Sequence, residues 1–234
     1  MLEIAGLQYQ PSTAAQPVLR DLDLRLQAGR PALVIGRSGS GKTTLLELIG
    51  GLAEASRGQI LWNGQPVNGR QRRWLCGLVF QFPERHFLGL TVGQELRLGQ
   101  RRLSNADAVA ALARVGLQGL NLQSAPERLS GGQQRRLALA VQLLRDPKVL
   151  LLDEPTAGLD WAMRADILEL LADLARERAV LVVTHEANLF APIAGDSWRL
   201  ELGVLRPLRS PELAGVSAGV SNPLAPSAAA DGPP

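Results

Sequence analysis

The stretch from Gly36 to Thr44, Gly-Arg-Ser-Gly-Ser-Gly-Lys-Thr-Thr, has residue types and a spacing that can bind phosphate. It fits the pattern G-x-x-x-x-G-K-[ST], in which glycines let backbone N–H groups converge on phosphate oxygens while the lysine adds a positive charge. By itself the pattern indicates only a nucleoside triphosphate site. The residues that we expect at this site are Gly36, Ser38, Gly39, Ser40, Gly41, Lys42, Thr43 and Thr44.

Two adjacent carboxylates, Asp153 and Glu154, follow an apolar run from Val149 to Leu152. Such a run is typical of a buried parallel strand, and ligands bind at the carboxyl ends of these strands. Asp153 suits a Mg²⁺ ion that bridges phosphates, and Glu154 can polarise an attacking water as a general base. Paired acids can also belong to a solvated loop, but their position directly after buried aliphatic residues favours a site.

A third polar stretch, from Leu129 to Gln133, reads Leu-Ser-Gly-Gly-Gln and opens a predicted helix. A serine hydroxyl and glycine N–H groups at a helix start can bind an anion. The same residues also fit an ordinary serine N-cap on a flexible turn. The stretch alone therefore leaves both interpretations open.

The elements that must position these residues are strands alternating with helices. The pattern predicts strands at residues 2–10, 18–27, 31–35, 59–62, 76–80, 149–152, 180–183 and 196–202. It predicts helices after the phosphate loop to about residue 50, and at 104–116, 132–145 and 161–178, with 70–73 as a polar connector. We therefore expect one α/β domain over 1–205, with its core at about 1–80 and 146–205 and a helical insertion at about 81–145. Residues 206–234 are Pro/Ala-rich and are predicted to form a disordered tail.

The composition narrows the class of protein. The 234 residues carry a net charge of +3, and the basic residues are dispersed, which does not favour a nucleic-acid surface. Cys76 is the only cysteine, so no internal disulfide can form, and its apolar surroundings predict a buried structural thiol. The sequence has neither a secretory signal nor the roughly 20 apolar residues of a membrane span. We expect a cytoplasmic protein that can still dock on a membrane protein.

Together these motifs resemble the nucleotide-binding domain of ATP-binding cassette (ABC) proteins, over about residues 2–205. In that family the stretch from Leu129 to Gln133 is the signature. The resemblance implies an α/β P-loop NTPase fold with a RecA-like parallel-sheet core, an N-terminal antiparallel β subdomain and an inserted α-helical subdomain. It also implies ATP and Mg²⁺ as cofactors.

The resemblance assigns roles to residues around the phosphates. Lys42 would bind the β- and γ-phosphates, and Thr43 and Asp153 would hold Mg²⁺. Gln81 would sense the metal and couple the site to a partner. Glu154 would be the general base.

Further roles follow from the same resemblance. Tyr9 would stack on adenine, with a strand core residue as the alternative, and His185 would contact the γ-phosphate. Asp160, at the end of the stretch Ala157-Gly158-Leu159-Asp160, would lie in a loop that crosses a dimer interface. The signature residues that would meet the ATP of a second copy are Ser130, Gly131, Gly132 and Gln133.

A finer resemblance points to ATPase subunits of energy-coupling-factor and cobalt/nickel-type importers. The segment Val79 to Glu84, Val-Phe-Gln-Phe-Pro-Glu, is similar to one that touches the membrane partner in that family. Three further matches, residues 82–87, residues 158–161 with 164–166, and residues 196–199, look like a cyanobacterial and plastid branch of stand-alone cassette ATPases linked to transition-metal homeostasis. Arg85-His86 and the Pro/Ala tail depart from the coupling-factor pattern.

We therefore expect an ATP-hydrolysing subunit at the inner face of a membrane. Its partners would be a second ABC ATPase subunit and a multi-spanning membrane subunit, with no nucleic acid, and its candidate solutes are a transition-metal ion or a vitamin. The alternative is a soluble ABC ATPase acting in Fe–S assembly, metal homeostasis, or on DNA or ribosomes. Such proteins usually carry tandem cassettes, long inserts or basic arms. A P-loop kinase or GTPase would turn over as a monomer and would not need the signature.

Overall fold

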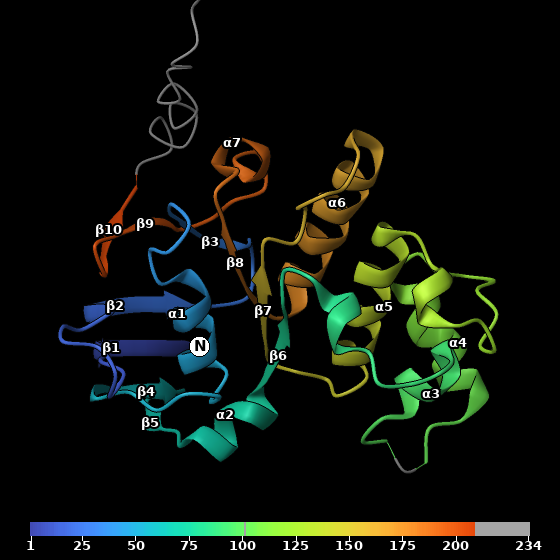
Figure 1. The fold of residues 1–234 in the computed structure, drawn as a ribbon, viewed down its shortest axis with the longest axis horizontal. Coiled ribbons are helices and arrows are strands. Elements are labelled where there is room, and N and C mark those ends of the chain that lie inside the picture. The colour runs from blue at the N-terminus through green and yellow to red at the C-terminus, as the bar shows by residue number, and fades with distance from the viewer. Residues whose placement is uncertain (101, 209–234) are drawn as a thin grey trace, which may run out of the picture.

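Two β-sheets organise the chain in the computed structural model, which describes residues 1–100 and 102–208 (Figure 1). The antiparallel sheet has the order β2-β1-β4-β5, and the larger sheet has the order β10-β9-β3-β8-β7-β6. The strands of the first are β1 (Leu2–Tyr9), β2 (Leu19–Leu26), β4 (Arg57–Trp62) and β5 (Gln65–Pro66). Those of the second are β3 (Ala32–Ile35), β6 (Cys76–Val79), β7 (Val149–Asp153), β8 (Ala179–Thr184), β9 (Ser197–Glu201) and β10 (Val204–Pro207).

The inner strands β3, β7 and β8 of the larger sheet are buried along their whole length, whereas the edge strand β10 is mostly exposed. In this sheet β6, β7, β8, β3 and β9 are parallel to their neighbours, and only β10 pairs antiparallel, with β9. Along β7, Val149 and Leu151 pack in one hydrophobic cluster while Leu150 and Leu152 pack in the other. Burial on both faces explains why the strand is an unbroken aliphatic run instead of an alternating one.

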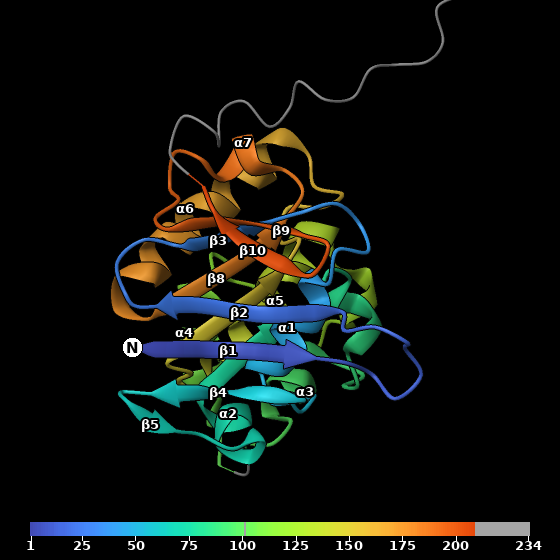
Figure 2. The ribbon, with the colours of Figure 1, turned by 90° about the vertical axis from the view of Figure 1, so that its left-hand side faces the viewer.

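Helices cover the sheets and form a separate layer to one side. They are α1 (Lys42–Ile49), α2 (Gly69–Leu75), α3 (Val92–Arg97), α4 (Asn105–Arg114), α5 (Gly131–Leu143), α6 (Trp161–Glu177) and α7 (Ala187–Phe190), with 3₁₀ turns η1 (Pro83–His86) and η2 (Pro126–Arg128). Helix α1 packs between the sheets, because its leucines share a hydrophobic cluster with β1, β2, β7 and β8 (Figure 2). Helices α3, α4 and α5 lie beyond β6 (Figure 1). The fold is thus the expected α/β P-loop arrangement, and we keep the division into core and helical subdomain as our interpretation.

The connector that we expected at residues 70–73 is wrong, because these residues belong to helix α2. Asn68 and Gln71 form a capping box, in which each side chain accepts from the backbone N–H of the other residue. Arg72 is buried and donates to the carbonyl oxygen of Val67 at 3.0 Å and to Glu54 Oε2 at 3.1 Å. These contacts hold a polar segment in a helix that its hydrophobic pattern does not indicate.

The start of the predicted tail also needs correction. Residues 206 and 207 belong to β10, and the N–H of Leu208 donates to the carbonyl oxygen of Ser197 at 2.8 Å. Pairing with β9 therefore extends the sheet past the point where the composition changes. The rest of the predicted tail, 209–234, lies outside the described residues.

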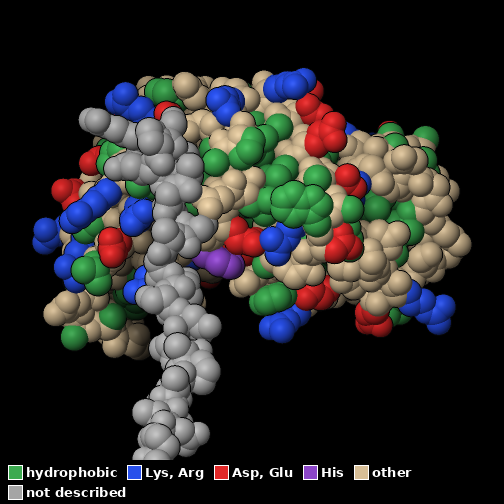
Figure 3. Space-filling model, turned by 90° about the horizontal axis from the view of Figure 1, so that it is seen from above, with side chains coloured by type: hydrophobic (Ala, Val, Ile, Leu, Met, Phe, Trp, Pro, Cys, Tyr) green, Lys and Arg blue, Asp and Glu red, His purple; other side chains and the backbone are tan. Residues whose placement is uncertain are grey.

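The surface of the described residues gives two further observations. None of the helices found there is both long and apolar enough to cross a membrane. On the face seen in Figure 3, basic and acidic side chains are interspersed with apolar ones, so no large patch of a single sign is visible.

Candidate functional site

A cleft of about 580 Å³ opens where strands β3, β6, β7 and β8 end. Ligands bind at this edge of open parallel sheets. The cleft brings together the phosphate loop, Gln81, both carboxylates and His185, which are far apart in the sequence. Its lining residues are Val18, Arg37, Ser38, Gly39, Gly41, Lys42, Thr43, Thr44, Gln81, Asp153, Glu154 and His185.

The phosphate loop reaches α1 without a side-chain cap. Gly41, the N-cap, has φ of 100° and no side-chain hydrogen bond to the first turn. This conformation favours glycine, and a β-carbon there would also lie 2.8 Å from Leu19 Cδ2, so that side chain would have to shift. The Lys42 ammonium donates to the carbonyl oxygens of Gly36 at 2.8 Å and Arg37 at 3.1 Å. The first N–H groups of the helix and a positive charge thus face the cleft, an arrangement that favours an anion.

Asp153 contacts the phosphate-loop helix directly. The hydroxyl of Thr43 donates to Asp153 Oδ2 at 2.6 Å, which joins the end of β7 to the start of α1. Burial raises the pKa of Asp153 above its ordinary value of 3.8, and Glu154 adds to this, while the Thr43 hydrogen bond and the Lys42 charge oppose it. A carboxylate and a hydroxyl beside the Gln81 carboxamide are oxygen donors of the kind that Mg²⁺ takes together with substrate phosphates. The residues present therefore fit this ion.

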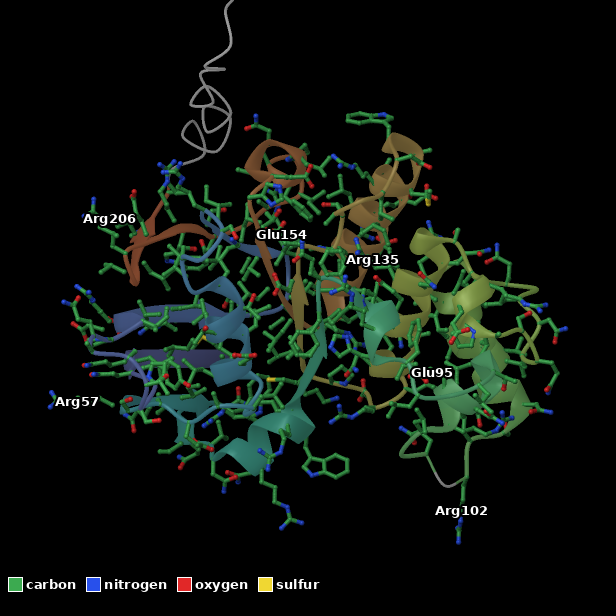
Figure 4. The ribbon with its side chains drawn as sticks, viewed as in Figure 1. Arg57, Glu95, Arg102, Arg135, Glu154 and Arg206 are labelled. Carbon is green, nitrogen blue, oxygen red and sulfur yellow. The ribbon has the colours of Figure 1, made fainter. Side chains whose placement is uncertain are left out.

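Glu154, which directly follows β7 (Figure 4), is held by contacts on both carboxylate oxygens. Oε2 accepts from the Thr184 hydroxyl at 2.7 Å and from the His185 N–H at 3.3 Å. Oε1 lies 2.8 Å from His185 Nδ1 and 3.9 Å from Lys42 Nζ. The φ of Glu154 is 46°, a left-handed conformation that is uncommon outside glycine and that is concentrated at functional sites.

Tyr9 lies near the cleft but is not part of its lining. It ends β1, and its carbonyl oxygen accepts from the N–H of Val18, a lining residue, at 2.8 Å. The side chain is half-buried and packs against the cluster that contains α1. This position is compatible with adenine stacking and with a core role, so the assignment stays a prediction.

The signature residues lie outside the cleft. Ser130 caps α5: its Oγ accepts from the Gln133 N–H at 3.3 Å, and Gln133 Oε1 accepts from the Ser130 N–H at 2.9 Å. Asp160 is the N-cap of α6, and its side chain accepts from the Met163 N–H at 2.9 Å without a reciprocal bond. The two starts are neighbours, because a β-carbon on Gly132 would lie 2.4 Å from Met163 Sδ. The predicted site residues therefore form two groups.

The structure adds residues that the sequence did not single out. Thr184, fully buried, holds Glu154, and its place at the end of a buried strand just before His185 could have revealed it. Arg164 joins the Asp160 loop to the segment after His185, since it donates to the Leu159 carbonyl oxygen at 2.9 Å and to Glu186 at 2.7 Å.

Comparisons with known proteins agree with this geometry. Residues 19–157 match the family model of the ABC transporter. The chloroplastic ABC transporter I family member 11 of Arabidopsis thaliana is 38% identical over 218 residues, which cover 86% of this chain and 78% of the relative. The energy-coupling factor transporter ATP-binding protein EcfA2 of Symbiobacterium thermophilum is 37% identical over 216 residues, which cover 87% of this chain and 75% of the relative.

A solved structure shows the same fold with the products of hydrolysis bound. The ATP-binding cassette MJ0796, a dimer in a post-hydrolysis state with ADP and Pi, superposes with a TM-score of 0.76 and 25% identity. The match covers 90% of this chain and 99% of that one. From the matched family model, the relatives and the converging phosphate loop and carboxylates, the chain belongs to the ABC transporter family, as an ATP-binding and ATP-hydrolysing subunit.

Proposed function

We propose that two cassettes bind ATP head to tail, each phosphate loop facing residues Ser130 to Gln133 of its partner, and that closure of this dimer drives a membrane subunit. The observation that carries the proposal is the split of the site residues. The cleft supplies Lys42, Thr43, Glu154 and His185, whereas Ser130 to Gln133 lie on a different part of the surface. The cassette MJ0796 is described as a dimer, which supports a dimer for this chain.

Within this proposal Glu154 activates the attacking water. Its contacts with Thr184 and His185 fix the carboxylate at the cleft, and a carboxylate has lone pairs left for a water. Thr43, Asp153 and Gln81 would hold Mg²⁺, which neutralises charge on the phosphates.

The segment after Gln81 is the part of the chain that we assign to the membrane subunit. Phe82 is 41% exposed, and Leu88 and Leu90 are each 80% exposed, although all three are large and apolar. The buried Glu95 accepts from the N–H groups of Leu88 and Gly89 at 2.8 and 2.7 Å, so this apolar loop has a fixed shape before any partner binds (Figure 4). A preformed exposed apolar loop beside Gln81 suits a helix of a multi-spanning protein.

We therefore propose that the chain works at the inner face of a membrane. The relative from Symbiobacterium thermophilum is an energy-coupling factor transporter ATP-binding protein, which supports a transport role for this chain. We propose uptake, with a transition-metal ion or a vitamin as the solute. Purification from detergent extracts tests this part. Recovery of a multi-spanning membrane protein is expected, and recovery of soluble partners alone would favour a role in Fe–S assembly or metal homeostasis.

The variant Glu154→Gln tests the proposal. The amide keeps the shape but cannot act as a base, so turnover should fall at least about 100-fold while ATP still binds. The variant should accumulate as a dimer with ATP, measured by light scattering after gel filtration. Glu169→Gln, an exposed residue of α6, is the control and should behave as the wild type. Near-normal turnover of Glu154→Gln would remove the base assignment, and a monomer with ATP would contradict the dimer.

A further inference from the structure

The side chain of Arg135 crosses from α5 to two loops of the cleft. Its guanidinium donates through one nitrogen to the carbonyl oxygens of Pro155 at 2.8 Å and Ala157 at 2.9 Å, and through the other to the carbonyl oxygen of Gln81 at 2.7 Å. Figure 4 shows Arg135 between α5 and the end of β7, where Glu154 lies. One side chain thus ties the helix that begins with the signature to the segments that follow the adjacent strands β6 and β7.

This arginine is buried without an opposite charge in contact. It is 4% exposed, no carboxylate of the described residues forms an ion pair with it, and its Nε has no hydrogen-bond partner there. Burial lowers its pKa, and the charge of Glu84 only partly opposes this. Burying a charge that is held by carbonyl groups alone is costly, so stability does not account for an arginine at this position.

The next residue provides a natural contrast. Arg136 is bound to Asp166 in an ion pair of 2.7 Å and to the carbonyl oxygen of Val115 at 3.3 Å, and neither partner lines the cleft. Two adjacent arginines on one helix therefore make different connections. Arg136 joins α5 to α6 and α4, whereas Arg135 joins α5 to the cleft.

The groups that Arg135 binds have separate roles in the proposed reaction. The side chain of Gln81 lines the cleft, and Pro155 directly follows Glu154. Ala157 opens the loop to Asp160. We propose that Arg135 is a positioning residue that couples the orientation of α5, and so of its signature, to the state of the ATP cleft in the same chain. The coupling rests on the head-to-tail dimer proposed above.

The test measures ATP-dependent dimerisation in the Glu154→Gln background. Adding Arg135→Met leaves three carbonyls unpaired, and the ATP concentration needed for half-maximal dimer should rise about tenfold or more. Arg135→Lys keeps the charge but reaches fewer carbonyls, so it should lie between the two. Arg136→Met is the matched control and should shift this concentration little. ATP binding to the monomer, measured by titration calorimetry at concentrations below dimerisation, should be unchanged in all of them.

Kinetics separate this role from a structural one. In the otherwise wild-type chain, Arg135→Lys should raise the KM for ATP, because more ATP is needed to form the dimer, with a smaller change in kcat at saturating ATP. Arg136→Met should change neither. Equal dimerisation of the Glu154→Gln chain with and without Arg135→Lys would overturn the coupling, as would an equal loss in Arg136→Met. If Arg135→Met does not fold, Arg135→Lys decides alone. Failure of the Glu154→Gln chain itself to dimerise would instead overturn the head-to-tail proposal, and the coupling with it.

Discussion

Two helix starts in this chain, those of α1 and α5, can face an anion. They differ in whether a side chain caps the backbone N–H groups of the first turn. At α1 the N-cap is Gly41, no side chain caps the first turn, and Lys42 is 8% exposed. At α5 Ser130 and Gln133 cap each other, and both side chains are exposed. The first start leaves its donors unpaired within a cleft, whereas the second has already paired part of its own.

The difference teaches which start can bind ATP alone. The start of α1 has a glycine N-cap and no side-chain cap, so it can bind a phosphate without losing an internal hydrogen bond. Asp153, Glu154 and His185 line the same cleft. At the start of α5 the capping box already uses the Ser130 hydroxyl and the Gln133 N–H. An anion must either replace these hydrogen bonds or be held mainly by another site. We therefore expect α1 to bind ATP in the monomer and α5 to contribute only in the dimer.

The largest effect should follow from Lys42→Ala. This change removes the charge at the α1 start, so ATP binding by the monomer should weaken and turnover should fall at least about 100-fold. Lys148→Ala is the control, because Lys148 is exposed and pairs only with Asp146 in the described residues. Titration calorimetry and phosphate release measure the two quantities. Tight ATP binding by Lys42→Ala would contradict the role given to α1.

Ser130→Ala should have a smaller effect of a different kind. Loss of the cap should lower the free energy of unfolding by about 1 kcal/mol, leave ATP binding by the monomer unchanged and lower turnover about tenfold. Ser104→Ala removes an equivalent cap from α4, where Ser104 Oγ accepts from the Asp107 N–H at 3.1 Å. It should show the same loss of stability with normal turnover.

Mixing the Lys42→Ala and Ser130→Ala chains sharpens this comparison. In a head-to-tail dimer, the mixed pair contains one site with an intact Lys42 and an intact Ser130. Turnover of the mixture should therefore exceed that of either variant alone. If the mixture is no more active than either variant alone, the phosphate loop and the signature act on the same ATP within one chain.

Much of the fold could be predicted, because strands of the larger sheet are buried on both faces. The aliphatic run before Asp153 marked β7 within one residue of its observed end. The sequence pattern does not predict helix α2, because a capping box and the burial of Arg72 stabilise it and neither produces a hydrophobic periodicity in the sequence. In α4, Ala108 and Leu112 are buried whereas the apolar Val109 is 49% exposed, so an apolar residue in a helical pattern does not by itself mark the core.

The candidate site also has a part that the sequence predicts and a part that it does not. Its cleft was predictable, because carboxyl ends of parallel strands meet at one edge and each brought a recognisable residue there. The hydrogen bonds of Arg135 to Gln81, Pro155 and Ala157 were not, because an arginine that binds backbone carbonyls needs no particular partner in the sequence. The Ser130 capping box is compatible with an ordinary N-cap and with an anion site that acts on the ATP of a partner chain.

The smallest predicted effect is on the reactivity of the Cys76 thiol, which lies in the hydrophobic cluster that contains α1. It is 4% exposed, packs in the same cluster as Leu45 and Leu46, and its Sγ lies 3.7 Å from the Ile49 carbonyl oxygen at the end of α1. Burial raises the pKa of its thiol from 9.0 to about 12, so the reactive thiolate is scarce in the folded protein at about pH 8.

Alkylation with iodoacetamide at about pH 8 should therefore be slow until the protein unfolds. Because the folded pKa of Cys76 is the higher one, its contribution to stability is complete below pH 9.0 and is lost as the pH rises towards about 12. Ser130→Ala and Ser104→Ala should change the labelling rate equally, through their common loss of stability. A rate that rises with Ser130→Ala alone would show that the two helix starts are already coupled within one chain, without ATP or a partner.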